Sequence, residues 1–238
     1  LAPLLDGPLI GGVLGGDGRI YDLYGKPYLT SYLCADSVTV KDKPVGDLRF
    51  HAAWSESQGS VEMEGELTRG PLKALDFAGR MEPGKGNLLD VELLFDRFDL
   101  TFIDPYLPEG ISDIQGMVTG KVDVTGTLDQ PMVNGLVDLE DAGLRIDYLN
   151  TLYTFSHQVK IAPDMFALDL VTIRDELGHT ARIGGTILHS GLKDWNFNVW
   201  GEMDDLLVLN TTVHDNSLYY GKAFAKGDLE VSGSVDLL

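Results

Sequence analysis

The feature that most constrains the fold of this chain is a regular alternation of apolar and polar residues. It is clearest in "SVEMEGELT" (60–68), "MVTGKVDVTGTL" (117–128), "ARIGGTI" (181–187) and "KGDLEVSGSVDL" (226–237). Because successive side chains of a strand point to opposite faces, this period predicts an all-β chain whose sheets have one wet and one apolar face. The residues predicted on the apolar rows are Val61, Met63, Leu67, Val118, Val122, Val124, Leu128, Ile183, Ile187, Leu229, Val231 and Val235.

A glycine interrupts each of these apolar rows, at Gly65, Gly126, Gly185 and Gly233. Glycine there costs backbone entropy and leaves nothing to pack, so each one needs a structural reason. The repeated unit, seen in "VEMEGEL", "VDVTGTL" and "LEVSGSV", favours an elongated stack of similar strands. Glycines that only kink a closed sandwich or barrel would give the same pattern, and both interpretations stay open at this point.

Turn-forming residues separate the segments, as in "EPGKGN" (82–87), "DPYLPEG" (104–110) and "LDQP" (128–131). The best helical candidate, "NLLDVELLFDRF" (87–98), is interpreted as a short weak helix or a strand. No Pro/Ser-rich linker divides the chain, so residues 1–238 are predicted to form one continuous, mostly antiparallel β architecture.

The charge balance limits the possible partners. The chain has 18 Lys and Arg against 37 Asp and Glu, a net charge of -19, and 44% of its residues are hydrophobic. Nucleic-acid phosphate and anionic lipid surfaces would repel it, so no nucleic-acid partner is expected. Any contact with lipid would need an enclosed or concave apolar surface. The acidity is equally explained as a means of keeping an elongated protein soluble.

The ends and the single cysteine add little. Cys34 excludes an internal disulfide and a multi-thiolate metal site, and we expect it to be a packed residue. The apolar N-terminal stretch is broken by Asp6, prolines and glycines, and it is too short to span a membrane. The chain begins with Leu1, so we expect it to be part of a longer protein.

No catalytic or metal-binding motif stands out. The five histidines lack zinc-ligand spacing, "GGVLGGDG" (11–18) lacks the Lys-Ser/Thr of a phosphate loop, and no GxSxG sequence occurs. Asp104, Asp147 and Asp164 are the carboxylates that could be checked for acid–base chemistry, although solvated charges explain them better. "DNS" (215–217) and "DLED" (138–141) lack calcium-loop spacing. We therefore predict no enzyme activity, no metal and no cofactor.

Aromatic residues gather in "DWNFNVW" (194–200), with Trp195, Phe197 and Val199 on one row and Trp200 on the other. Such a row can stack against sugars, but we favour a place in the core.

Over residues 100–238 the chain resembles a known family. The stretch "GMVTGKVDVTGTLDQPMVNGLVDLEDAGLRIDYLNTLYTF" (116–155) resembles the TamB and AsmA-like proteins of Gram-negative envelopes. In that family, G-T-L is followed by a proline turn, then P-x-x-x-G-x-V-x-L, then an A-G-L step. Residues 178–199 and 207–238 look like the TamB-type proteins of the Bacteroidota, and residues 1–99 match only in repeat style. The matching positions are Gly126, Thr127, Leu128, Pro131, Gly135, Val137, Leu139, Ala142, Gly143 and Leu144.

This resemblance implies a long periplasmic protein held in the inner membrane by an N-terminal helix that lies outside this chain. It implies a curved sheet folded lengthwise into a trough with an apolar concave interior, along which phospholipid acyl chains move between the two membranes. It also implies a possible outer-membrane barrel partner of the TamA/BamA type. On this hypothesis the apolar-row residues given above line the groove, and the row glycines, such as Gly185 and Gly233, relieve crowding and leave width for an acyl chain.

Two alternatives remain. A scaffold that offers sheet edges to outer-membrane strands by β-augmentation would use the same fold. A carbohydrate-binding β-sandwich would instead have a closed core and an exposed aromatic platform.

Overall fold

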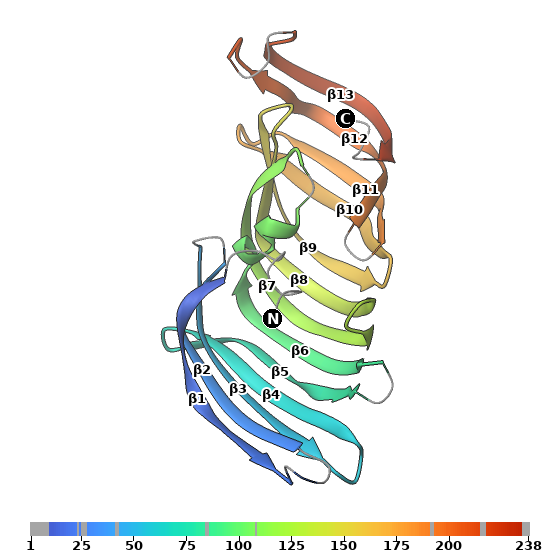
Figure 1. Ribbon diagram of the computed structural model, residues 1–238. Coiled ribbons are helices and arrows are strands. Elements are labelled where there is room, and N and C mark those ends of the chain that lie inside the picture. Colours follow the sequence, from blue (N-terminus) through green and yellow to red (C-terminus); the bar gives the residue numbers. More distant parts are fainter. Residues whose placement is uncertain are drawn as a thin grey trace. The chain divides into compact units, whose positions relative to one another are not determined.

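The computed structural model describes residues 10–22, 24, 28–40, 43–83, 86–107, 109–190, 193–214 and 218–234. Within these residues, thirteen strands form one antiparallel sheet in which each strand pairs with its neighbours in sequence, and this sheet does not close into a barrel (Figure 1). The all-β prediction is confirmed. No helix in the described ranges has the length and apolar character needed to cross a membrane.

The strand bounds follow the alternating stretches and the turns between them. In order along the chain they are β1 (Ile10–Tyr21), β2 (Tyr28–Val40), β3 (Lys43–Ser55), β4 (Ser60–Arg69), β5 (Leu72–Glu82), β6 (Leu88–Asp99), β7 (Ile111–Thr127), β8 (Pro131–Ile146), β9 (Thr151–Ala162), β10 (Met165–Asp175), β11 (Thr180–Ser190), β12 (Lys193–Thr211) and β13 (Gly221–Ser234), with the 3-10 helix η3 (Leu100–Tyr106) after β6. The segment 87–98, for which we left a helix or a strand open, is therefore strand β6.

The sheet contains two compact units. The first unit comprises Leu1–Phe98 and Thr119–Gly135, and the second comprises Asp99–Val118 and Leu136–Leu238. Strands β7 and β8 contribute to both units, and each unit is described separately below.

Several of the strands contain a β-bulge. Seven strand residues other than glycine have φ between 47° and 54° in the described part of the chain: Ser37, Arg97, Asp113, Asp141, Leu170, Asp194 and Asp205. The ladder register shifts at Ser37, Leu170 and Asp205. Each bulge adds a residue to one strand, so the strand bends and the apolar row resumes on the same face beyond it.

The displaced backbone amide of a bulge needs an acceptor other than the ladder carbonyl. A side chain of the following strand supplies it in three cases: the Ser37 amide donates to Asp47 Oδ1 at 2.8 Å, the Arg97 amide to Thr119 Oγ1 at 3.1 Å, and the Asp141 amide to Ser156 Oγ at 2.9 Å. In these three cases a side chain of the next strand in the sequence stabilises the bend.

Gly126 lies at another backbone distortion, immediately before the turn between β7 and β8. The turn is closed by two backbone hydrogen bonds between Thr127 and Gln130, of 3.2 and 3.1 Å. Gly126 has φ +87°, and a Cβ there would lie 2.6 Å from the Gln130 carbonyl oxygen. Its backbone conformation explains this glycine, so Gly126 does not support our hypothesis that a glycine leaves width above the lining.

Candidate functional site

The first unit has a continuous apolar face. The register of β2 to β6 places apolar residues side by side in rows across the strands. The rows are Leu33–Phe50–Gly65–Phe77–Leu93, Ala35–Leu48–Leu67–Leu75–Phe95, Ala52–Met63–Gly79–Val91, and Trp54–Val61–Met81–Leu89. The predicted lining residues Val61, Met63 and Leu67 lie on this face.

The large side chains of this face stay partly open to solvent. Leu67 is buried, whereas Val61, Met63, Phe77 and Leu93 are only half-buried, as are most of their neighbours in the rows. In a closed sandwich, a second layer would bury such residues almost completely. The described residues of the first unit thus leave this apolar face available for contact.

One of the row glycines has its space filled by the protein itself. A Cβ on Gly65 would lie 2.3 Å from the Phe77 ring and 2.5 Å from the Arg49 carbonyl oxygen. The Phe77 ring also stacks on Phe50, with 5.9 Å between the centroids. Gly65 therefore makes room for an aromatic ring of the neighbouring strand, which corrects our hypothesis that it leaves width for a guest.

The opposite face of the first unit carries paired charges. Lys73 Nζ lies 2.5 Å from Asp76 and 3.3 Å from Glu66, and Lys121 Nζ lies 2.5 Å from Glu92. The hydrogen bond to Asp76 raises the pKa of Lys73, and the one to Glu92 raises that of Lys121. These pairs are solvent-exposed, so they keep the face wet and add little stability.

A shallow hollow of about 520 Å³ lies on this charged face. Its lining includes Tyr32, Arg49, Glu64, Lys73 and Leu94. Because Arg49, Lys73 and the carboxylates near them already pair with one another, the hollow presents no convergent set of unpaired groups to a ligand.

The second unit also has an apolar face, built by β9 to β13. The register aligns Phe166–Ile187–Phe197–Gly233, Leu168–Gly185–Val199–Val231 and Val171–Ile183–Gly201–Leu229 across β10 to β13. The predicted lining residues Ile183, Ile187, Leu229 and Val231 therefore share one face. Gly185, with φ +144°, lies where the Asn198 carbonyl of β12 comes within 2.1 Å of the position a Cβ would take.

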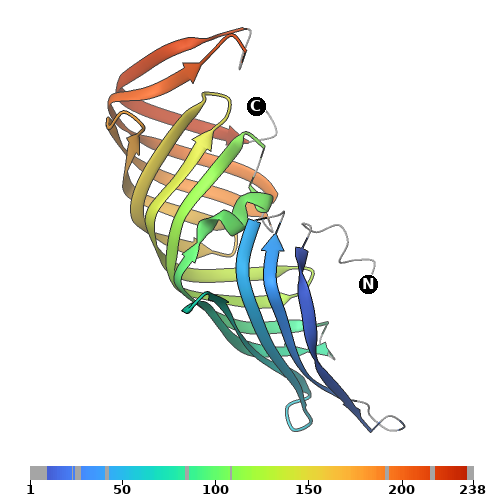
Figure 2. The same cartoon turned by 90° about the vertical axis from the view of Figure 1, so that its left-hand side faces the viewer.

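Part of this face is covered by the protein's own chain. At Asp205, β12 bends and its residues Leu206–Thr211, paired with Gly221–Ala225 of β13, fold back over β9 and β10; we call this hairpin end the overhang. Figure 2 shows the bend of both strands near the top of the view. Beneath the overhang, a buried cluster joins Val171, Ile173, Ala181, Met203 and Leu206.

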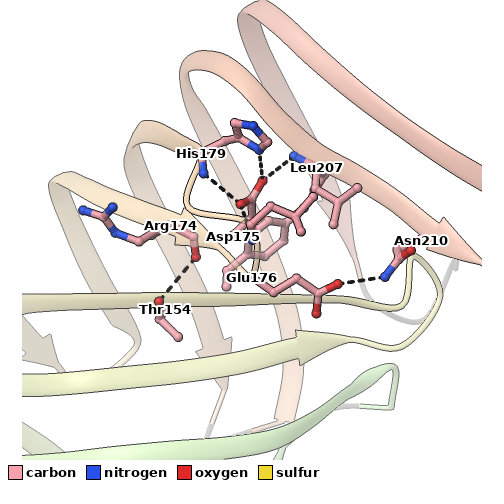
Figure 3. Close-up of polar contacts among 9 residues, drawn as sticks. Thr154, Arg174, Asp175, Glu176, His179, Leu207 and Asn210 are labelled. Carbon is pink, nitrogen blue, oxygen red and sulfur yellow. Dashed lines mark hydrogen bonds and ion pairs between the residues drawn. The ribbon is translucent and has the colours of Figure 1, made fainter.

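A buried carboxylate holds the overhang in place (Figure 3). The side chain of Asp175 is fully buried and points to the apolar face. Its Oδ1 accepts from the amides of Leu177 and His179, both at 2.9 Å, and its Oδ2 accepts from His179 Nδ1 at 3.0 Å and from the Leu207 amide at 2.8 Å. Burial favours the neutral acid, but these donors outweigh it and lower the pKa of Asp175.

Further hydrogen bonds attach the overhang to β9 and to the turn before it. The Tyr153 hydroxyl donates to the Leu207 carbonyl at 2.8 Å, and Asn150 Nδ2 donates to the Asn210 carbonyl at 2.8 Å. Asn210 in turn donates from Nδ2 to Glu176 Oε1 at 2.8 Å, as Figure 3 shows.

At the other end of the same strands lies a cluster of three aromatic rings. The ring centroids of Phe166 and Trp195 are 6.1 Å apart. The ring centroid of His189 lies 5.0 Å from that of Phe166 and 5.4 Å from that of Trp195. Burial lowers the pKa of His189, against the opposing influence of Asp164, so its imidazole is neutral at neutral pH. Trp195, which we expected in the core, is half-buried.

The remaining predicted residues are distributed as follows. Val122 is buried and Val124 half-buried in the first unit, and Val118 is buried in the second. Leu128 does not continue the row, because β7 ends at Thr127 and Leu128 lies 56% exposed in the turn. Val235 lies outside the described residues. Of the other motif positions, Pro131 opens β8, Gly135 and Gly143 lie within it, and Gly233 lies in β13 beside Phe197.

The carboxylates considered for catalysis do not converge. Asp104 lies in η3, Asp147 in the turn between β8 and β9, and Asp164 in the turn between β9 and β10, and none of the three is buried. "DLED" (138–141) is part of strand β8, and "DNS" (215–217) lies outside the described residues. Among the residues that the structure describes, no group of three or more His, Cys, Asp or Glu is placed to hold a metal ion.

Comparisons of this chain with protein-family models, with curated proteins and with solved structures found no match. The resemblance to the TamB and AsmA-like family therefore stays a prediction from the sequence.

Proposed function

We propose that this chain is a non-enzymatic segment of a TamB-like envelope protein of the periplasm, and that its apolar faces carry phospholipid acyl chains between the inner and the outer membrane. The observation that carries this proposal is the apolar face of the first unit, formed by β2 to β6. From β3 to β6 its rows run without a polar residue, and most of their large side chains remain half-buried; in β2, Ser31 stands opposite Ala52 at the end of one row.

The energy of acyl-chain exposure supplies the reason for such a face. Two chains of about fifteen methylenes each would cost roughly 24 kcal/mol in water, at about 0.8 kcal/mol per methylene. A carrier only has to keep these methylenes against apolar side chains at every step, and no bond needs to be made or broken. The paired charges of Lys73, Asp76 and Glu66 keep the opposite face of the first unit in water.

The proposal is tested by measuring phospholipid retained by the purified protein, using native mass spectrometry and lipid extraction. Two neighbouring leucines of β6 offer a matched pair: Leu93 is half-buried on the apolar face, and Leu94 is 44% exposed on the charged face. The corresponding pair in β11 is Ile187 on the apolar face and Thr186 on the opposite face.

We expect the double variant Leu93→Glu/Ile187→Glu to retain at least tenfold less phospholipid than the wild type, because an acyl chain would desolvate both carboxylates. The control Leu94→Glu/Thr186→Glu should stay within twofold of the wild type. Circular dichroism establishes that the variants are folded, and Leu93→Gln/Ile187→Gln serves if the glutamates unfold the protein. Absence of retained phospholipid in the wild type, or equal retention in both double variants, would refute the proposal.

The scaffold function is kept as a second candidate because of the sheet edges. In the described part of the chain, β1 and β13 each pair with one strand only, so each has a free row of backbone donors and acceptors. Photo-crosslinkers on β13 that trap an outer-membrane barrel protein, together with a wild type that retains no phospholipid, would favour this function.

A further inference from the structure

The two ends of the apolar face in the second unit differ. One end lies beneath the overhang, where Val171 and Leu206 are nearly inaccessible to solvent. The other end, near the turn between β9 and β10, has no such cover among the described residues, and Ile187, Phe197 and Val199 remain half-buried there. An occupant of this face would therefore meet a closed end and an open end.

The closed end is a built feature of the fold. The overhang is bound by the carboxylate of Asp175, the hydroxyl of Tyr153 and the amide of Asn150, each at 2.8 Å from the backbone of β12. Beneath it, Val171, Ile173, Ala181 and Met203 pack against Leu206 of the overhang in a buried apolar cluster. This end can contact an acyl chain only at its terminal carbons.

The open end carries the residue types that suit a boundary between hydrocarbon and water. Trp195 combines an apolar ring with a polar N–H group and stays half-buried beside Phe166, and His189 is buried against both rings. Tryptophan gathers at the interfaces of lipid bilayers for this reason. This end therefore suits the ester and headgroup region of a lipid.

The distance between the two ends fits one acyl chain. Trp195 and Gly201, which pairs with Ile183 at the edge of the covered cluster, are six residues apart on β12. At about 3.3 Å per residue this is roughly 20 Å. One leaflet of a bilayer contributes roughly 15 Å of hydrocarbon.

The charge of the chain favours one class of headgroup. The net charge is -19, and Asp164 lies next to His189 at the open end, where its backbone carbonyl accepts from the His189 amide at 2.9 Å. An anionic headgroup would be repelled, whereas a zwitterionic headgroup carries a cation that complements this charge.

We propose that the second unit holds a zwitterionic phospholipid in a single orientation, with its chain termini against the overhang and its headgroup region at Phe166, His189 and Trp195. This inference rests on the proposed function, because it specifies how the acyl chains lie on one of the two faces.

Fluorescence quenching by spin-labelled phosphatidylcholine tests the orientation. The variant Trp54→Phe/Trp200→Phe leaves Trp195 as the only tryptophan, and the protein is loaded with phosphatidylcholine labelled at carbon 5 or at carbon 16 of one acyl chain. We expect the carbon-5 label to quench Trp195 at least twofold more strongly than the carbon-16 label. Equal quenching or the reverse order would overturn the inference.

Two further variants sharpen the result. With Phe155→Trp as the only tryptophan, the order should reverse, because Phe155 packs beside the covered cluster. With Trp200 alone, which lies half-exposed on the opposite face over Gly184, neither label should quench strongly. Retention of labelled lipid without a preferred order refutes the orientation alone, and no retention of lipid refutes the proposed function as well. Preference for labelled phosphatidylglycerol over phosphatidylcholine would overturn the choice of headgroup.

Discussion

Replacing Asp175 by asparagine removes the charge that fixes the overhang of the second unit. The carboxylate accepts four hydrogen bonds, two at each oxygen, and its side chain is inaccessible to solvent. An asparagine can keep its carbonyl oxygen toward the amides of Leu177 and His179. Its NH₂ group then faces both the Leu207 amide and His179 Nδ1, so the Leu207 amide loses its acceptor and the NH₂ group can donate only to His179 Nδ1 in the Nε2–H tautomer.

The expected loss follows from this geometry. An unsatisfied buried amide costs about 1–3 kcal/mol, and the remaining bonds lose the contribution of the charge, so Asp175→Asn should lower the free energy of unfolding of the second unit by about 3 kcal/mol. At 1.4 kcal/mol for each factor of ten, hydrogen exchange of the Leu207 amide should become faster by roughly 100-fold. The exposed Asp169 of the same strand gives the control, and Asp169→Asn should change stability by less than about 0.5 kcal/mol.

The effect should also depend on pH with a definite sign. The pKa of Asp175 is lowered in the folded protein from its ordinary 3.8, so the carboxylate contributes its full stability above that value. The contribution is lost as pH falls below 3.8 and through the lower pKa of the folded state. The stability difference between wild type and Asp175→Asn should therefore be constant near neutral pH and shrink in acid. A loss below about 1 kcal/mol with unchanged exchange of Leu207, or a difference that grows in acid, would refute this account of the clamp.

Two other substitutions follow from the backbone distortions. Thr119→Val deletes the acceptor of the Arg97 amide at the β6 bulge, so it should lower the free energy of unfolding in urea by about 1 kcal/mol. Thr119→Ser keeps the hydroxyl and should restore this stability. Equal losses in both variants would contradict a role for the hydroxyl. Gly65→Ala places a methyl group against the Phe77 ring and should lower the free energy of unfolding by about 1–3 kcal/mol. Gly15→Ala, with no atom within 4 Å of the new Cβ, should be neutral or slightly stabilising. Equal shifts of the thermal unfolding temperature in both variants would contradict the packing argument.

Alternation was sufficient to predict the strands but not their bends. The stretches at 60–68 and 181–187 and the described part of 226–237, residues 226–234, lie in β4, β11 and β13, since a period of two follows directly from the pleat. At 87–98 the pair Asp96 and Arg97 breaks the period, and the resulting spacing of apolar residues imitates a helix. The signal for a bulge was present in these consecutive polar residues between apolar ones, a step that recurs at Glu140 and Asp141.

The clamp at Asp175 could be predicted only in part. "DELGH" (175–179) carries a local signal, because an aspartate before a glycine turn often accepts from amides two and four residues later. Its bond to Leu207 joins residues 32 positions apart, and nothing in the alternation of β12 reveals that this strand folds back at Asp205. Pattern also could not show that the Phe77 ring fills the space at Gly65, since that depends on a rotamer of the neighbouring strand.

Because the bulge amides donate to side chains of the following strand, a bulged strand and the strand after it have to be inherited together. Ser37, Arg97 and Asp141 each depend on an oxygen atom carried by the strand that follows. A duplication or deletion that moved one bulged strand without the following strand would leave a backbone N–H group without its acceptor. Lengthening or shortening of a sheet of this kind therefore has to proceed by strand pairs, and recombination breakpoints should fall on the side that precedes a bulged strand.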